Sequence, residues 1–281
     1  MVNAGPAVGG AWGQPIILSG TAVDPGANDQ STLSYSWDFG DGSPSASGGA
    51  STVHSYVAPG VYTATLTSCD QWRACASAST PVTVNKRNVT ASYAAPTGGT
   101  FDTPTTLRAS LTDEFGQAVA GRAVKFSVNG AYIGSSTTDA SGSATLAYTP
   151  ELAAGTYLTG VSFAGDTLYS AASAGGSITL VQTATAVTYT GALSGLPNKT
   201  VTLSATLTDA TGTALAGKVI TFVVGAQTIR ATTNPSGIAT TTLKLAQHVG
   251  TYALSATYSP TVADSAFYVG SAASISFTIG K

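Results

Sequence analysis

The last two thirds of the chain contain the same sequence pattern twice, and this repeat limits what the chain can fold into. The segment TLRASLTDEFGQAVAGRAVKFSVNG, which begins at Thr106, lines up with TLSATLTDATGTALAGKVITFVVGA, which begins at Thr202, an offset of 96. Further along, TTDASGSATL from Thr137 matches TTNPSGIATT from Thr232 at an offset of 95, and we expect the residue lost between the blocks to lie in a hairpin loop. A period near 95 residues is too long for a solenoid unit and fits a whole small domain. We therefore predict three domains, at residues 1–86, 87–181 and 182–281.

Strand patterns dominate all three segments. Residues 252–258 read YALSATY, so that large apolar residues alternate with small or polar ones, as on a strand with one buried and one solvated face. The same alternation begins at Tyr157 in the second segment and at Tyr62 in the first. No stretch shows a convincing 3.6-residue period, and Gly, Pro, Asn and Asp interrupt the strands. The sequence therefore predicts an all-β chain.

A Gly-x-Tyr triplet opens the penultimate predicted strand of each segment, with its tyrosine at Tyr62, Tyr157 or Tyr252. In immunoglobulin-type sandwiches, a tyrosine at this corner hydrogen-bonds the preceding loop and fixes the crossover between the sheets. About seven strands in about 95 residues, with this triplet, favour three tandem immunoglobulin-like Greek-key β-sandwiches. The linkers around residues 86–87 and 182–183 are short, so we expect an elongated rod about 110 Å long.

The first segment contains the strings VNAGP at residues 2–6, YSWDFGDGS at residues 35–43 and HSYVAPGVYTATLT at residues 54–67. With these strings the segment resembles the PKD (polycystic kidney disease repeat) family of extracellular sandwich modules. His54 falls inside the family's structural pattern, which implies a core or turn histidine and not a ligand.

The WDFGDG string also has a direct physical interpretation. Trp37 and Phe39 alternate with Asp38, so both rings can face the core of the predicted sandwich. The three residues that follow are suited to a turn with positive φ: Gly40, Asp41 and Gly42.

The second and third segments resemble bacterial immunoglobulin-like repeats, which occur in tandem in surface and secreted proteins. The shared text is LTD, AGRAVKFSVNG, TTDASGSATL and GTY in the second segment and the corresponding strings in the third. The third segment departs from it where YSPTVADSAFYVGSA replaces FAGDTLYSAAS, so a longer loop is expected there.

Composition excludes several classes of function. The 11 Lys and Arg residues cannot build the strongly basic surface of a nucleic-acid-binding protein, and no apolar run approaches the ~20 residues that span a bilayer. His54 and His248 are the only histidines and lie in different domains, no G-x-S-x-G string occurs, and two Cys with two His exclude a His/Cys metal cluster. We therefore expect neither catalysis nor a cofactor.

Four carboxylates of the first segment are the candidates for a calcium site: Asp24, Asp29, Asp38 and Asp41. The EF-hand pattern is absent, and Asp is common in turns for its own backbone bonds, so calcium remains a minor alternative. Counted by segment, the net charges are −3, −2 and +3, which sum to the −2 of the whole chain and allow a mild head-to-tail attraction between molecules.

Cys69 and Cys75 are the only cysteines, and they flank a five-residue loop between two predicted strands. Opposite positions across such a hairpin come within the Cα spacing of a disulfide, so we predict a bridge that would persist in an oxidising compartment. Two buried thiols are the alternative. The bridge would hold Trp72, at the apex of the loop, out in solvent as a candidate contact residue.

The leading functional hypothesis is a non-catalytic extracellular spacer or adhesion module of a larger prokaryotic cell-surface or secreted protein, as both resemblances imply. A second hypothesis is an accessory region that holds a secreted hydrolase on polysaccharide or protein, with Trp12, Trp72 and Tyr132 as candidate exposed contacts. A third is a repeating subunit of a filament or virion surface, joined by edge strands. The partner is accordingly a protein or glycan at a surface, or another copy of the chain.

Overall fold

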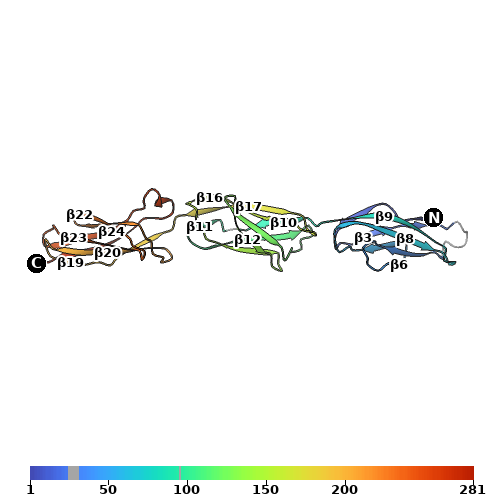
Figure 1. Cartoon of the computed structure of the whole chain (residues 1–281), viewed down its shortest axis with the longest axis horizontal. Helices are drawn as coiled ribbons and strands as arrows, with labels where there is room; N and C mark the ends of the chain where they lie inside the picture. The colour runs from blue at the N-terminus through green and yellow to red at the C-terminus, as the bar shows by residue number, and fades with distance from the viewer. Residues whose placement is uncertain (25–31, 95) are drawn as a thin grey trace.

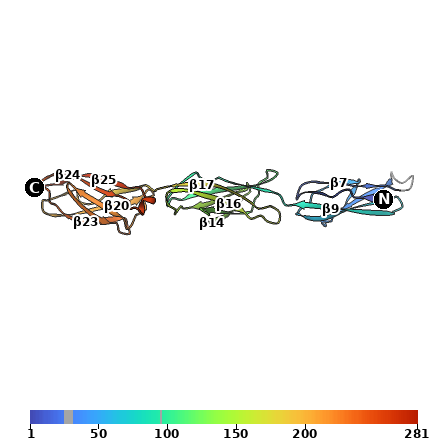
Figure 2. The same cartoon turned by 90° about the horizontal axis from the view of Figure 1, so that it is seen from above.

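The computed structural model describes residues 1–24, 32–94 and 96–281, and its regular structure is almost entirely β. Two perpendicular views show three separate bodies of strands arranged end to end along one axis (Figures 1 and 2). The fold is therefore the expected row of β-sandwich domains in an elongated molecule. Within the described ranges, no helix is long and apolar enough to cross a membrane.

The first domain pairs one five-stranded sheet, in the order β2-β9-β8-β5-β6, with the two-stranded sheets β1-β4 and β3-β7. Its strands are β1 (Val2–Asn3), β2 (Val8–Ala11), β3 (Ile16–Ser19), β4 (Thr21–Ala22), β5 (Ser34–Asp38), β6 (Ala46–Gly48), β7 (Ser51–His54), β8 (Gly60–Cys69) and β9 (Cys75–Asn85).

The second and third domains have one topology, as the sequence repeat requires. Each has a three-stranded sheet, β10-β12-β15 or β18-β20-β23, and a five-stranded sheet, β11-β17-β16-β13-β14 or β19-β25-β24-β21-β22. The strands of the second domain are β10 (Val89–Tyr93), β11 (Gly98–Thr100), β12 (Thr105–Asp113), β13 (Ala123–Val128), β14 (Ala131–Thr137), β15 (Ser143–Tyr148), β16 (Gly155–Phe163) and β17 (Ala172–Val181). Those of the third are β18 (Thr185–Tyr189), β19 (Ser194–Gly195), β20 (Thr200–Asp209), β21 (Val219–Val224), β22 (Gln227–Thr232), β23 (Ile238–Lys244), β24 (Gly250–Tyr258) and β25 (Ser271–Ile279), with a short 3₁₀ turn η2 (Asp264–Ala266) in the long loop before β25.

Each domain buries its own apolar core between its sheets. The alternation in β24 places Leu254, Ala256 and Tyr258 on the inner face, where each is at most 2% exposed. In the first domain Trp37 and Phe39 are 1% and 3% exposed. Burial of such side chains contributes about 1.5–3 kcal/mol each, so every domain has a substantial core of its own.

The turn after Phe39 requires glycine. Gly40 has φ +71°, and a Cβ at this position would lie 2.4 Å from the carbonyl oxygen of Thr63. Gly42 also has positive φ, at +81°. Asp38 supports the turn by accepting a hydrogen bond from the backbone N–H of Gly40 at 2.9 Å.

The three Gly-x-Tyr tyrosines make the same contact. The hydroxyl of Tyr62 donates to the carbonyl of Ala58 at 2.9 Å, and the hydroxyl of Tyr157 donates to that of Ala153 at 2.9 Å. In the third domain the hydroxyl of Tyr252 donates to the carbonyl of His248, again at 2.9 Å. The loop before each penultimate strand is therefore fixed to that strand by its own tyrosine.

The one-residue difference between the repeats lies inside a strand, so its predicted place in a hairpin loop is wrong. Both hairpins have two-residue turns, because Val128 pairs with Ala131 and Val224 pairs with Gln227. The second domain instead carries a β-bulge in β14, where the register with β13 shifts and Ile133 is the extra residue. A bulge takes up one residue without changing the turn, whereas β21 and β22 pair without interruption.

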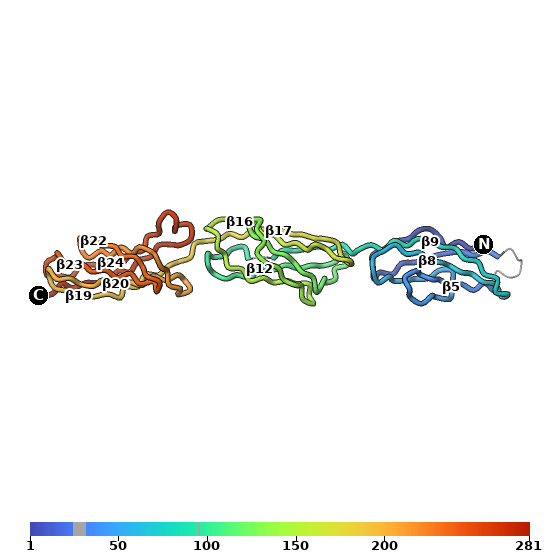
Figure 3. Tube along the Cα trace, in the orientation of Figure 1, coloured from blue at the N-terminus to red at the C-terminus, as the bar shows by residue number. Residues whose placement is uncertain are grey.

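The chain passes from one domain to the next through short segments, and Figure 3 shows one segment of chain between neighbouring domains. Strand β9 ends at Asn85 and β10 begins at Val89, while β17 ends at Val181 and β18 begins at Thr185. The exact domain boundaries at 86/87 and 181/182 stay a prediction.

Removal of one corner hydroxyl should weaken the domain that contains it. We expect Tyr157→Phe to lower the free energy of unfolding of the second domain by about 1 kcal/mol, because the hydrogen bond to Ala153 is lost and the ring is kept. Chemical denaturation of the full chain measures this, with Tyr132→Phe, on an exposed ring, as the matched control. Equal effects of the two variants would contradict the role of the corner.

Candidate functional site

The acidic side chains of the first domain are the candidate metal ligands. The described residues contain no group of three or more His, Cys, Asp or Glu placed to hold a metal ion. Asp38 and Asp41 each bind backbone N–H groups of their own turn, at Gly40 and Ser43. Asp29 lies outside the described residues, so the calcium hypothesis stays a prediction.

Asp41 and His54 form a small polar cluster on the first domain. The Nε2 of His54 lies 2.7 Å from Oδ2 of Asp41, and Oδ1 of Asp41 accepts hydrogen bonds from the N–H and Oγ of Ser43. The imidazole stacks on Phe39 with ring centroids 3.8 Å apart and meets Tyr56 edge-on. Burial acts to raise the pKa of Asp41, but the hydrogen bonds from Ser43 and His54 outweigh it and lower this pKa to about 2. The hydroxyl of Ser43 therefore donates to the Asp41 carboxylate and not to the imidazole of His54.

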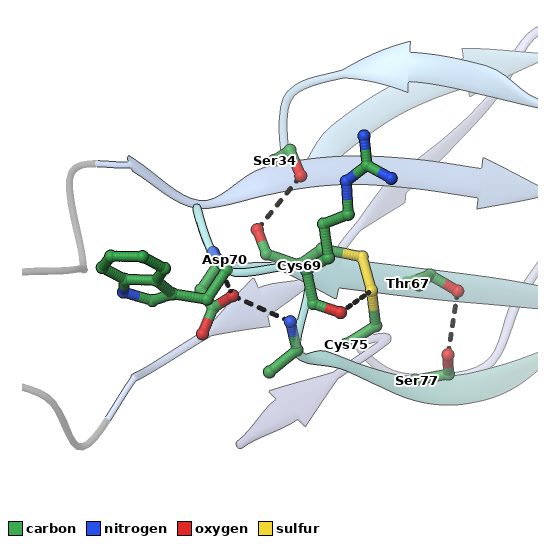
Figure 4. The surroundings of a disulfide bond; sticks show 9 residues. Ser34, Thr67, Cys69, Asp70, Cys75 and Ser77 are labelled. Carbon is green, nitrogen blue, oxygen red and sulfur yellow. Dashed lines mark hydrogen bonds between the residues drawn. A yellow bond between two sulfur atoms is a disulfide. The ribbon is translucent and has the colours of Figure 1, made fainter.

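The predicted disulfide is confirmed and closes the β8–β9 hairpin (Figure 4). Cys69 and Cys75 are directly paired in the sheet, with Cα atoms 4.1 Å apart. Oδ1 of Asp70 accepts hydrogen bonds from the N–H groups of Trp72 and Ala74, both at 2.8 Å. The loop is thus held by a covalent bond and by a carboxylate, at the end of the first domain opposite the second.

Two of the three candidate contact aromatics lie on the surface. Trp72, in the bridged loop, is 77% exposed, and Tyr132, on β14, is 64% exposed. Their role in binding a partner stays a prediction.

The prediction that Trp12 is an exposed contact residue is wrong, because Trp12 lies between two domains. Its Nε1–H donates to the carbonyl of Leu168 at 2.7 Å, and its ring meets Tyr169 edge-on at 5.5 Å. It packs against the cores of both the first and the second domain. The predicted exposure failed because Trp12 follows β2 at the end of the domain that the second domain covers.

Arg87 organises this first junction. Its Nη1 lies 2.8 Å from Oδ2 of Asp113 and donates to Oε1 of Gln117, and its Nε donates to the carbonyl of Trp12. The guanidinium carbon lies 4.2 Å from the centre of the Trp12 ring and 5.2 Å from that of Phe115. Arg87 is only 6% exposed, so a charge at the linker is buried against one carboxylate and two aromatic rings.

The second junction uses aromatic contacts in place of a charge. Phe101 of the second domain lies 4.7 Å from the ring of Phe267 and 5.5 Å from that of Tyr268. The linker residue Thr183 is 1% exposed and donates through its hydroxyl to the carbonyl of Phe101. In the repeat, Thr183 occupies the position of Arg87, at an offset of 96.

In both junctions the linker backbone forms an isolated parallel β-bridge with the following domain. Arg87 donates its N–H to Leu168 and accepts from Ser170, at 3.0 and 2.9 Å. Thr183 does the same with Phe267 and Val269, at 2.8 and 2.9 Å. Each linker residue is therefore held to the following domain through both its backbone N–H and its carbonyl.

The loop that receives each linker is fastened by an equivalent ion pair. Arg122 pairs with Asp166 at 2.5 Å and lies over the ring of Tyr169, while Lys218 pairs with Asp264 and lies over the ring of Tyr268. The hydrogen bond from Lys218 is the main reason that the pKa of Asp264 lies below its usual value.

Sequence reasoning named residues 86–87 and 182–183 only as linkers and missed these contacts. One usable signal was the rarity of charge. The chain has only 11 Lys and Arg, so a basic residue in a linker, Arg87, indicated a specific contact.

Comparison with known proteins gives a family for the first domain. Residues 1–85 match the family model of the PKD domain, so the first domain is a PKD domain. No curated protein matches the chain.

Solved structures of tandem β-domains resemble the whole chain. They include a tetra-tandem repeat from the extending region of a large adhesion protein (17% identity, 95% of this chain and 71% of that one, TM-score 0.39). Three immunoglobulin domains of a titin variant are also similar (11% identity, 99% and 96%, TM-score 0.35), as is a structure of a 1.5-MDa bacterial ice-binding adhesin (13% identity, 95% and 91%, TM-score 0.31). Likenesses at these TM-scores carry no argument.

Truncation of the junction arginine should cost more than truncation of an exposed one. We expect Arg87→Ala to lower the free energy of unfolding of the second domain by about 3 kcal/mol, because Asp113 keeps a buried charge that loses its partner. Thermal and chemical denaturation measure the effect, with Arg108→Ala on the exposed face of β12 as control. A loss no larger than that of the control would show that the ion pair contributes little.

Loss of the bridge should destabilise the first domain alone. Replacing Cys69 and Cys75 together by serine should lower its free energy of unfolding by about 2 kcal/mol, from the loop entropy of a seven-residue ring. Denaturation with and without reductant measures this. Reductant should weaken the native chain to the level of the variant and leave the variant unchanged, and a native chain insensitive to reductant would contradict the expectation.

Proposed function

We propose that this chain is a non-catalytic spacer and adhesion module of a larger prokaryotic cell-surface or secreted protein. The observation that carries the proposal is that both junctions bury their linker residue. Arg87 is 6% and Thr183 is 1% exposed, and each is hydrogen-bonded through its backbone to the domain that follows. Domains joined in this way keep their relative direction, so that whatever stands at one end of the chain is held at a set distance from the other.

The disulfide supports an extracellular setting. A bridge between Cys69 and Cys75 persists in oxidising compartments and is uncommon in the cytosol. Low charge is compatible with this setting, since Asp, Glu, Lys and Arg make up only 9% of the residues. The PKD domain at residues 1–85 and the resemblance of the other two domains to bacterial immunoglobulin-like repeats lead to the same proposal.

A second candidate function is an accessory region that binds polysaccharide or protein. The exposure of Trp72 favours it, because the disulfide and Asp70 hold this indole in solvent at the outer end of the rod, with little ordering cost left for binding. Retention of the full chain on insoluble glycans, lost in Trp72→Ala and kept in Tyr35→Ala, would select this candidate.

Small-angle scattering tests the proposed spacer. We expect a monomer with a maximum dimension of about 110 Å and a profile that fits the structure as one rigid particle. Insertion of six Gly and Ser residues after Lys86 should broaden the distance distribution, because Arg87 then no longer aligns the first two domains. A compact particle near 60 Å, or a native profile as broad as that of the insertion variant, would overturn the proposal. So would turnover of a hydrolase substrate that follows the pure protein.

A further inference from the structure

One of the differences between the two copies of the repeated domain lies in the β-hairpin at the edge of the five-stranded sheet, at the first residue after the turn. In the third domain, Gln227 begins β22, and its side chain reaches the chain that leaves β23. Its Nε2 donates to the carbonyl of Lys244 at 2.9 Å, and its Oε1 accepts from the N–H of Ala246 at 2.9 Å. The carboxamide therefore fills a place between the hairpin and the opposite sheet with one donated and one accepted hydrogen bond.

In the second domain the same place is left open, because Ala131 stands where the third domain has Gln227. The correspondence is structural, since Ala131 pairs with Val128 as Gln227 pairs with Val224. A methyl group cannot bridge to the chain after β15.

The backbone groups that the missing side chain would bind are still present. Thr149 and Glu151, which follow β15, correspond at an offset of 95 to Lys244, the last residue of β23, and to Ala246. In the part of the chain that the structure describes, no hydrogen bond reaches the carbonyl of Thr149 or the N–H of Glu151.

An apolar-sided cleft lies at this place in the second domain. The side chains of Ala131, Ile133, Tyr148 and Leu152 line it together with Thr149 and Glu151. Leu152 stands at the position of Gln247, whose Nε2 donates to the carbonyl of Val224 in the third domain. The third domain therefore uses a second amide where the second domain has an aliphatic side chain.

The β-bulge of β14 is part of the same difference. Its extra residue, Ile133, belongs to the lining of the cleft, and the third domain has no bulge there. Bulges re-aim side chains and often occur beside binding sites.

We infer that this cleft binds the glutamine side chain of a peptide segment of a partner protein. Gln227 shows which chemistry fits. Its primary carboxamide donates to the carbonyl of Lys244 and at the same time accepts from the N–H of Ala246. The aliphatic stem of an incoming glutamine would lie against Ile133 and Leu152, whereas the alanine methyl leaves room for it. This inference rests on the comparison of the two copies and is independent of the spacer role.

The negative charge of Glu151 beside the cleft makes the inferred binding selective for glutamine over glutamate. A glutamate side chain can accept from Glu151 N–H but cannot donate to Thr149, and it would meet the like charge of the Glu151 carboxylate. An apolar side chain would cover the backbone pair and leave it without partners. Glutamine satisfies both groups.

The test uses the isotopically labelled full chain and a short peptide. The probe is N-acetyl-Ala-Gln-Thr-Ile-amide, which copies residues 226–229, and its control has Glu in place of Gln. Two hydrogen bonds and a small apolar contact are expected to give a dissociation constant on the order of 1 mM, so the titration extends several-fold beyond it. We expect the amide resonance of Glu151 to move with the glutamine peptide and to stay in place with the control.

Two reciprocal variants locate the effect. Ala131→Gln should close the cleft from within, so that the Glu151 amide exchanges more slowly with solvent, the second domain melts at a higher temperature and the peptide no longer binds. Gln227→Ala should open the equivalent place in the third domain and make the Ala246 amide respond to the peptide. Ser135→Gln, on an exposed position of β14, is the matched control and should change none of these quantities.

The following results would overturn the inference. They are a Glu151 resonance that does not move with the glutamine peptide, an equal response to the glutamate peptide, and binding that survives Ala131→Gln. An effect confined to resonances along the outer edge of β14 would assign the peptide to strand addition instead, and would likewise reject the cleft.

Discussion

The buried guanidinium of Arg87 contacts both the first and the second domain, and the proposed alignment of these two domains depends on it. Arg87 sits in a segment of three residues between β9 and β10, yet it is tied by its backbone to Leu168 and Ser170 and by its side chain to Asp113. A buried charge tolerates little displacement, since its pairing and hydrogen bonds offset a desolvation cost of several kcal/mol. The rings of Trp12 and Phe115 cover the guanidinium and keep water from it. These contacts are the basis of the proposal that the PKD domain and its neighbour keep one relative direction.

The second junction reaches the same mechanical result with different chemistry. Thr183 replaces the arginine, and the contacts of Phe101 with Phe267 and Tyr268 replace its ion pair. What the two junctions share is the backbone pattern and the ion pair that fastens the receiving loop, Arg122 with Asp166 or Lys218 with Asp264. The backbone pattern and the ion pair are therefore properties of the repeated domain. The side chain at the linker position differs with the preceding domain that it contacts.

The repeat also separates what the fold requires from what it allows. Tyr157 and Tyr252 make the same hydrogen bond because both domains need the same crossover. Ala131 and Gln227 both occupy the first position after a two-residue turn, yet they differ in side chain, and only the strand that begins with Ala131 carries a bulge. Positions of this second kind are where two otherwise equal domains can differ in what they bind.

The sequence alone determined the all-β class, the tandem order, the corner tyrosines and the paired cysteines, because each is written in a local pattern: strand alternation, a repeat, a triplet, a five-residue loop. The contacts of Trp12 and Arg87 were beyond that reasoning, because their partners Leu168 and Asp113 lie 156 and 26 residues away and no sequence pattern pairs them. The one-residue deletion was misplaced for a similar reason, since a bulge and a longer turn leave the same trace in an alignment. Only the tertiary structure decided these points, because they depend on which surfaces of separate sheets come together.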